Sequence, residues 1–191
     1  MKKSYQKLQQ EYAKLKQEEN AAMANLDEWL KHHTTKRETP PQRDPILLCS
    51  RNMAFLYLSA CLCLKDETFG EKFKIHLYIV EAYAKQVFRR QDSVYLFLQI
   101  ALCDIVPSVE PTIQLYMPDF IINAKTSETQ TFIRYVMKLS NHLRKTSYPW
   151  YGKALLKSTI IALRSERFFI TSNKTTFINR LMKELQTYNE N

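Results

Sequence analysis

The stretch DPILLCSRNMAFLYLSACLCL, residues 44–64, decides how this chain folds. Asp44 followed by Pro45 suits the start of a helix, because the carboxylate can accept from first-turn amides and proline at the first helical position loses no needed donor. The twelve residues from Met53 to Leu64 include no charge. A helix that is apolar on all sides must be enclosed by other elements or by lipid. Twelve residues fall short of the roughly 20 that cross a bilayer, so we predict the central helix of a soluble domain and no membrane span.

Composition favours helices in the rest of the chain. Only two glycines, Gly70 and Gly152, occur in 191 residues, and 45% of the residues are hydrophobic. Tight β-turns and phosphate-binding loops depend on glycine, whereas this apolar content is enough for a sizeable core. The sequence therefore predicts an all-α fold.

Apolar residues recur at helical spacing after the central helix. Asp92 or Ser93 should cap a helix that Pro107 ends, and Ser127 with Gln130 forms a capping box for a later helix. The expected helices span about 71–90, 94–106, 112–117, 127–144, 149–164 and 173–188. The inner face of the helix over 127–144 should consist of Phe132, Ile133, Val136, Met137, Ser140 and Leu143. The inward face of the last helix should consist of Phe177, Ile178, Leu181, Met182, Leu185 and Tyr188. Successive antiparallel pairs of this kind predict an irregular multi-helix stack of the armadillo/HEAT-like type, although the sequence shows no 20–50-residue repeat.

The N-terminal part reads as one long polar helix over residues 2–33. Its less polar positions alternate at spacings of three and four: Tyr5, Leu8, Tyr12, Leu15, Glu19, Ala22, Leu26 and Trp29. This heptad pattern has two interpretations, a helix packed on its own domain or a coiled coil with a partner or a second copy. Residues 34–43 contain Pro40 and Pro41 and no other apolar residue, which predicts a linker and few contacts between residues 1–33 and the helical domain 44–191.

The cysteines indicate the compartment. Cys49, Cys61, Cys63 and Cys103 all lie in apolar helical runs, where a free thiol behaves as a small hydrophobe. The first twenty residues are charged and polar, unlike a signal peptide. We expect no disulfide framework and a reducing compartment, the nucleus or cytoplasm, with the nucleus favoured.

Sequence motifs give no support for catalysis. The chain lacks GxSxG, GxxxxGK[ST], HExxH and CxxC patterns. Cys61 and Cys63 are two residues apart and diverge by about 200° on a helix, so they cannot share a metal. We therefore predict that the protein is not an enzyme and has no catalytic, cofactor or metal site.

The positive charge is concentrated near the C-terminus. Residues 126–191 contain eleven Lys/Arg and four Asp/Glu, a net +7 out of +9 for the chain. Such asymmetry favours an acidic partner. The expected partner-binding residues are Arg134, Lys138, Lys145, Tyr148, Trp150, Tyr151, Lys153, Lys157 and Arg164.

The aromatic run Tyr148-Pro149-Trp150-Tyr151 lies between Lys145 and Lys153. Exposed tyrosine and tryptophan often anchor protein interfaces, and they can also stack on bases. In the alternative interpretation, Trp150 fills the junction between two helices and contributes only to packing.

These observations lead to two functional hypotheses. In the first, the chain is a non-enzymatic interaction or scaffold module of a larger intracellular complex and docks a protein partner, either an acidic surface or a peptide, on its helical surface. Residues 2–33 would add a second contact or form a homodimer. In the second, the basic C-terminal helices bind nucleic acid.

Overall fold

The computed structural model describes residues 3–33 and 45–188, without the side chains of residues 26, 27 and 29–33. The expected linker 34–43 and the Asp44 cap lie outside these residues. The elements, in chain order, are α1 (Tyr5–His33), α2 (Pro45–Cys63), η1 (Glu67–Phe69), α3 (Gly70–Val87), α4 (Gln91–Ala101), η2 (Cys103–Ile105), α5 (Val106–Tyr116), α6 (Thr129–Arg144), α7 (Pro149–Arg164) and α8 (Lys174–Gln186). Within the described ranges, β pairing is limited to an isolated bridge between Thr126 and Phe169. The all-α prediction is confirmed.

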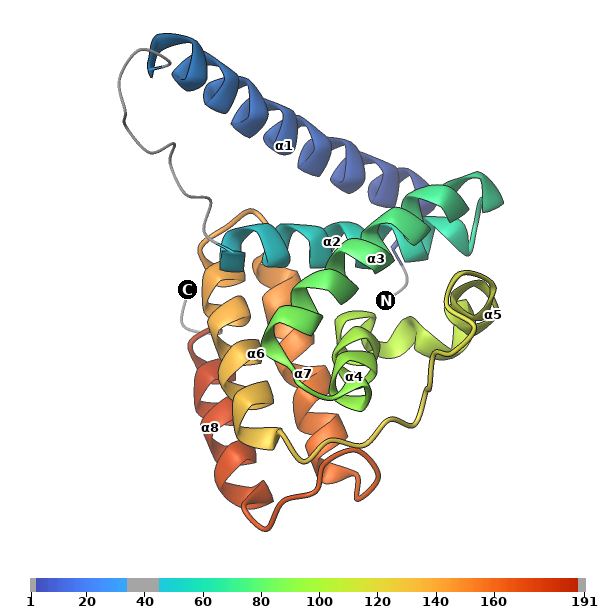
Figure 1. Ribbon diagram of the computed structural model, residues 1–191, viewed down its shortest axis with the longest axis vertical. Helices are drawn as coiled ribbons and strands as arrows, with labels where there is room; N and C mark the ends of the chain where they lie inside the picture. Colours follow the sequence, from blue (N-terminus) through green and yellow to red (C-terminus); the bar gives the residue numbers. More distant parts are fainter. Residues whose placement is uncertain (1–2, 34–44, 189–191) are drawn as a thin grey trace.

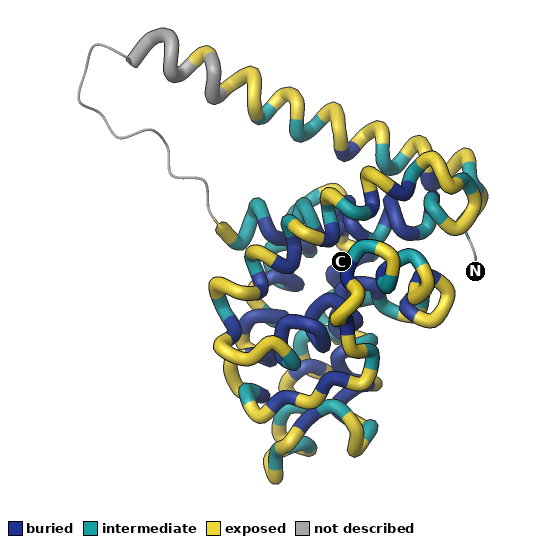
Figure 2. The backbone as a smooth tube through the Cα atoms, turned by 45° about the vertical axis from the view of Figure 1, so that its right-hand side comes forward, coloured by how far each residue is buried: buried dark blue, intermediate teal, exposed yellow. Residues whose placement is uncertain are grey.

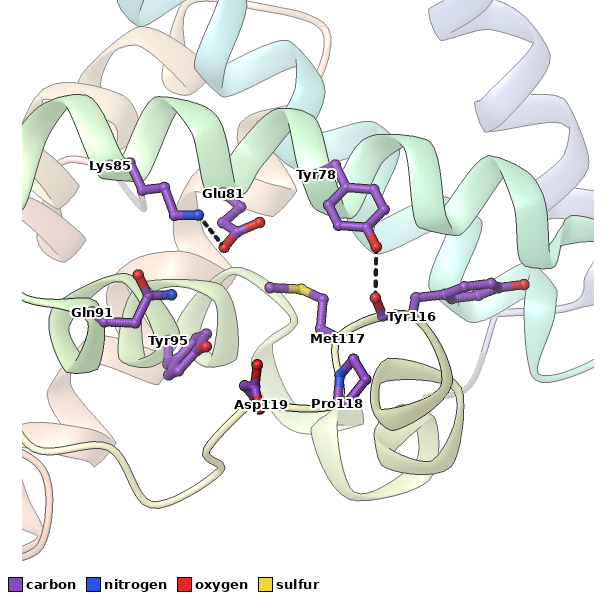
Figure 3. A pocket seen from close by; sticks show the side chains of 9 residues that line it. All are labelled: Tyr78, Glu81, Lys85, Gln91, Tyr95, Tyr116, Met117, Pro118 and Asp119. Atoms are coloured by element: carbon purple, nitrogen blue, oxygen red, sulfur yellow. Dashed lines mark hydrogen bonds and ion pairs between the residues drawn. The ribbon is translucent and has the colours of Figure 1, made fainter.

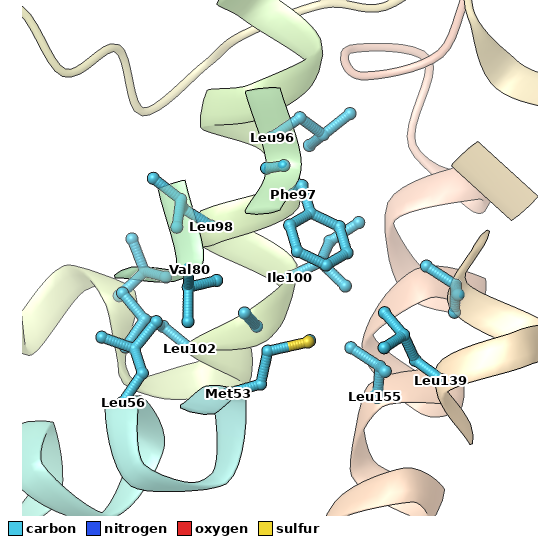
Figure 4. Close-up of a cluster of buried hydrophobic side chains, with 14 of the residues drawn as sticks. Met53, Leu56, Val80, Leu96, Phe97, Leu98, Ile100, Leu102, Leu139 and Leu155 are labelled. Atoms are coloured by element: carbon cyan, nitrogen blue, oxygen red, sulfur yellow. The ribbon is translucent and has the colours of Figure 1, made fainter. Parts of the chain in front are cut away.

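Helix α2 lies at the centre of the fold, as its uncharged sequence predicts. It crosses the top of the body in Figure 1 and contacts α1, α3, α4 and α6. Its side chains Met53, Phe55 and Leu58 are fully buried. Figure 4 shows Met53 and Leu56 meeting side chains of α4, among them Phe97, in one apolar cluster. Enclosure on all sides explains why this helix carries no charge between Met53 and Cys63.

By length and composition alone, α2 could also cross a membrane. It has 19 residues, and 56% of its most apolar window is buried inside the fold. Core helices pass the same compositional test as membrane spans. The absence of a membrane span stays a prediction.

Helix α4 ends earlier than the sequence predicts. It stops at Ala101, and the chain then bends by 105° into η2 and α5. At the break, Cys103 has a φ of 54°, in the left-handed region that non-glycine residues rarely adopt. The hydroxyl of Tyr151, 50 residues further along, donates to the carbonyl of Ala101 at 2.6 Å. The prediction of a helix that continues to Pro107 is therefore wrong. The carbonyl of Ala101, at the end of α4, accepts a long-range hydrogen bond from Tyr151.

The expected caps of α4 and α6 are also wrong. The carboxylate of Glu128 accepts from the amides of Arg89 and Arg90, at 3.1 and 3.2 Å, and from the Ser93 hydroxyl. Neither Asp92 nor Ser93 is the N-cap residue of α4, which is Arg90. Helix α6 begins at Thr129, and its N-cap residue is Glu128 rather than the predicted Ser127. The Glu128 carboxylate does not cap α6, because it is bound to the start of α4. One carboxylate thus joins two helices that are separate in sequence.

The three C-terminal helices pack on one another as well as on the central helices. Helices α6 and α7 pack on each other, and α8 lies against them (Figure 1). The predicted inner stripe of α6 is confirmed, with Phe132 and Val136 fully buried. Gly152 allows α8 to approach, because a Cβ there would overlap the hydroxyl of Tyr188, which hydrogen-bonds Ser140. Met182, expected to face inward on α8, is instead 38% exposed, since this edge helix has one buried residue among its thirteen.

The buried side chains of α1, among those that the structure describes, lie in its first half. Leu8 and Leu15 are buried, and the Tyr12 hydroxyl lies 3.2 Å from Nε2 of His76 on α3. Tyr5 donates to Asp66 at 2.9 Å. The expectation of few contacts between residues 1–33 and the domain is therefore wrong for this half. The first heptad positions pack on the domain of the same chain. Figure 1 shows the second half of α1 extending away from the body, and Figure 2 shows exposed positions along much of the coloured part of this helix.

Candidate functional site

The first predicted cations form a row on α6. Arg134, Lys138 and Lys145 are exposed and follow one another at spacings of four and seven, on the side opposite the buried Phe132 and Val136. None of the three side chains makes an ion pair or hydrogen bond with any residue that the structure describes. We call these residues the α6 row. It presents uncompensated positive charge and no large apolar side chain.

A second row runs along α7. Lys153 is half-buried, whereas Lys157 and Arg164 are exposed and have no ion pair within the described part of the chain. Ile161 lies between them, one helical turn from each, and is 68% exposed. We call Lys153, Lys157, Ile161 and Arg164 the α7 row. It differs from the α6 row because it combines cations with a large exposed aliphatic side chain.

The two rows lie on separate helices. Each row lies on the side of its helix turned away from the buried residues of that helix, and α6 and α7 pack on each other. The α6 row holds cations alone, whereas the α7 row adds Ile161, so variants in one row can serve as controls for variants in the other.

The two tyrosines of the aromatic run belong to the interior rather than to the surface. Tyr151 is fully buried, and Tyr148 is 5% exposed and donates to Glu18 of α1 at 3.0 Å. Burial raises the pKa of both phenols. Because they are enclosed, Tyr148 and Tyr151 offer no face for a partner, in contrast to the role that the sequence suggested.

Trp150 occupies the junction between helices. Its ring lies 5.6 Å, centroid to centroid, from the rings of Tyr57 on α2 and Tyr151. The ammonium of Lys3 is 3.5 Å from the centre of the Trp150 ring, within cation–π range. This geometry favours the interpretation of Trp150 as a packing residue that also helps to hold the start of α1.

A groove that the sequence does not predict opens between α3 and α4 (Figure 3). It has a volume of about 330 Å³, and the segment after α5 closes one end. The lining side chains come from three separate parts of the chain: Tyr78, Glu81, Lys85, Gln91, Tyr95, Tyr116, Met117, Pro118 and Asp119. Sequence spacing could not have revealed this groove, because its residues are brought together by the bend between α4 and α5.

The groove contains an unusual carboxylate. Among the residues with described side chains, Glu81 is the only charged residue that is buried. Its carboxylate pairs at 2.7 Å with Lys85, one turn along α3, whose side chain is 53% exposed. The hydroxyl of Tyr78 donates to the carbonyl of Tyr116 at 2.6 Å and thereby joins α3 to the end of α5.

Burial keeps three of the thiols and one imidazole in their neutral forms. Burial raises the pKa of Cys61 to about 11 and the pKa values of Cys49 and Cys103 to about 12. Burial also lowers the pKa of His76 to about 4, so its imidazole is neutral near pH 7. A thiol with a raised pKa is a poor nucleophile. The described residues include no group of three or more His, Cys, Asp or Glu that could hold a metal ion.

Comparison with known proteins gives no match: no protein-family model, no curated protein and no solved structure matches this chain. Function has to be inferred from the two cationic rows and the groove themselves.

Proposed function

We propose that the chain is a non-enzymatic protein-interaction module, a helical stack of the armadillo/HEAT-like type, that docks an acidic protein segment along the α7 row. The observation that carries this proposal is the exposure of Ile161, at 68%, between Lys157 and Arg164. Neither cation is compensated within the described residues.

The chemistry of the row supports one kind of partner. Cations steer an acidic partner and fix its register, while burial of an exposed aliphatic side chain adds apolar free energy on contact. A segment with carboxylates on both sides of an apolar residue would match Lys157, Ile161 and Arg164 at helical spacing. Such a segment would lie along α7 as a helix or an extended peptide on a ridge.

The outer half of α1 provides a second contact in this proposal. The first half is engaged with the body through Leu8 and Leu15. A homodimer or a second partner would use residues beyond Glu19, because the heptad pattern continues there in the sequence with Ala22, Leu26 and Trp29.

A second candidate function rests on the α6 row. Arg134, Lys138 and Lys145 present charge without an apolar side chain, which suits phosphate contacts in a nucleic acid. The burial of Tyr148 and Tyr151 argues against base stacking beside these cations. Nucleic-acid binding is therefore the weaker proposal, and it uses a different row.

Matched charge reversals separate the two functions. The test pair is Lys157→Glu with Arg164→Glu, accompanied by Ile161→Asp as a single variant. The control pair is Arg134→Glu with Lys138→Glu on the α6 row. Each protein is used in a capture experiment from a reducing extract, with and without nuclease, and captured proteins are identified by mass spectrometry.

The proposal expects an acidic protein that survives nuclease treatment, binds the parent and the control pair, and is lost from both α7 variants. Its affinity should fall by at least about tenfold in the test pair. Loss of binding only in the control pair, together with sensitivity to nuclease and a steep linear dependence of log affinity on log salt, would instead establish nucleic-acid binding.

A further inference from the structure

We propose that the groove between α3, α4 and residues 116–119 binds the guanidinium group of an arginine side chain from a partner. This site lies on different helices from the α7 row, and its occupancy does not depend on the function proposed for that row. The inference rests on the charge, the lining and the size of the groove.

Charge complementarity points to a cation. The chain has a net charge of +9, yet the groove lining carries Glu81 and Asp119 against the single cation Lys85. The groove is thus a locally acidic site on a basic protein. A cationic ligand would be attracted to it, whereas the same ligand would be repelled from the α6 and α7 rows.

Lys85 already shows how a cation would be bound. Its ammonium lies 2.7 Å from the buried carboxylate of Glu81, while about half of its side chain remains exposed. A lysine at the surface can swing away at little cost, because its partner is on the same helix one turn earlier. An incoming guanidinium would replace this ammonium at Glu81 and leave the carboxylate paired throughout.

The lining favours guanidinium over ammonium. Rings of Tyr78 and Tyr95 and the thioether of Met117 lie beside the acidic groups, whereas the ring of Tyr116 points away from them (Figure 3). A planar guanidinium stacks on aromatic faces and donates bidentate hydrogen bonds to carboxylates, whereas an ammonium is a compact, strongly hydrated charge. Glu81 and Asp119 come from opposite sides of the groove in Figure 3, so both are placed to face a group between them.

The groove is large enough for a side chain. Its volume of about 330 Å³ is at the lower end of the roughly 300–1,000 Å³ found for small-molecule sites. An arginine side chain fits this scale.

The experiment is a titration of the full chain, labelled with ¹⁵N, with the peptide acetyl-Gly-Arg-Gly-amide. A peptide with citrulline in place of arginine is the neutral isostere, and a lysine peptide tests the preference for guanidinium. The arginine peptide should shift amide resonances of residues 78–95 and 116–119, with clearly smaller effects from the other two peptides.

Two variants on α3 should change the affinity in opposite directions. Glu81→Gln should weaken arginine binding by at least about tenfold, because the paired carboxylate is lost. Lys85→Met should strengthen it several-fold, because the competing ammonium is removed. Glu71→Gln, an exposed position on the same helix outside the groove, is the matched control and should have no effect.

Because Glu81→Gln changes a buried residue, Asp119→Asn provides an exposed variant that should also weaken binding and cannot act through loss of the fold. Equal shifts from the arginine and citrulline peptides would overturn the proposal. So would weaker binding by Lys85→Met, or a lysine peptide that binds as tightly as the arginine peptide.

Discussion

Helices α1 and α2 cross each other in contact, yet they are held in different ways. Helix α2 has 19 residues, of which ten are buried. Helix α1 has 29 residues, and among its described side chains only Leu8 and Leu15 are buried. Polar contacts complete its attachment, such as the one between Tyr12 and His76.

The difference shows that helix length does not determine how much a helix contributes to the core. A long helix with a heptad pattern contributes less to the core than a shorter helix without charge, because free energy follows the apolar area removed from water. We infer that α2 organises the fold and that α1 is a peripheral element whose release leaves the body folded. Substitutions in each helix test this contrast.

Leu58→Asp should prevent folding. The side chain is fully buried in α2, and burying an unpaired carboxylate costs several kcal/mol against a total stability of about 5–15 kcal/mol. Circular dichroism should show loss of helix and of the cooperative thermal transition. Leu64→Asp is the matched control, since Leu64 follows α2 and is 45% exposed. A Leu58→Asp protein that melts like this control would contradict the assignment of α2 as the central helix of the fold.

Leu15→Asp should release α1 and leave the body folded. The lost burial corresponds to about 2–4 kcal/mol, limited by the total contribution of α1 to stability. Limited proteolysis should cut within residues 5–19 while the fragment from residue 45 onward resists. Ala13→Asp, at an exposed neighbouring position, controls for the introduced charge. Global unfolding of Leu15→Asp would mean that α1 is part of the core.

Acid should loosen the contact between α1 and α3 through His76. Burial, offset in part by Glu19 and reinforced by Lys16, lowers the pKa of His76 to about 4 in the folded chain. The unfolded chain, with a pKa near 6.5, therefore binds more protons between these values, so stability falls as pH drops from about 6.5 towards 4. Between about pH 6.5 and 4 the parent should lose on the order of 2–3 kcal/mol of its free energy of unfolding through His76. His76→Phe should not show this loss, and its ring should keep the stacking on Phe55.

Melting curves at pH 7 and pH 5 measure this effect, because most carboxylates titrate below this range. The carboxylate of Glu128, which joins α4 and α6, also stays ionised in this range. Although partial burial alone would raise its pKa, hydrogen bonds from Ser93 and the amides of Arg89 and Arg90 hold the pKa below the usual value. An unchanged pH dependence in His76→Phe would show that His76 is not the group responsible.

The smallest effect on stability is expected at the α7 row. Lys157→Glu and Arg164→Glu each change an exposed side chain without an ion pair in the described chain, so each should alter the free energy of unfolding by less than about 0.5 kcal/mol. Chemical denaturation of each single variant beside the parent is the measurement. A larger loss would mean that these cations serve packing, and their use as a docking surface would then be in doubt.

Much of this architecture follows from local sequence. The uncharged run from Met53 places α2 at the centre, and the helical spacing of Phe132 and Val136 gives the inner face of α6. Both predictions depend on periodicity and burial, which neighbouring residues determine. Such features can be read without knowledge of the rest of the chain.

Long-range contacts account for most of what the sequence did not predict. The end of α4 depends on a hydroxyl of Tyr151, and its start depends on Glu128, 35 residues after Ser93. Burial of Tyr148 depends on the position of α1, which supplies Glu18. The acidic groove needs three segments to converge. None of these partners is near in sequence, so residue spacing could not predict them.

Native-state hydrogen exchange on the full chain compares the local stability of α1 and α2 in one measurement. We predict that amides of residues 53–62 exchange only through global unfolding, with the largest protection in the protein. Amides of residues 8–19 should exchange through a separate opening of lower free energy, and Leu15→Asp should remove their protection without affecting that of α2. Equal protection of both helices in the parent, lost together in the variant, would contradict the claim that the fold is organised around α2 with α1 at its periphery.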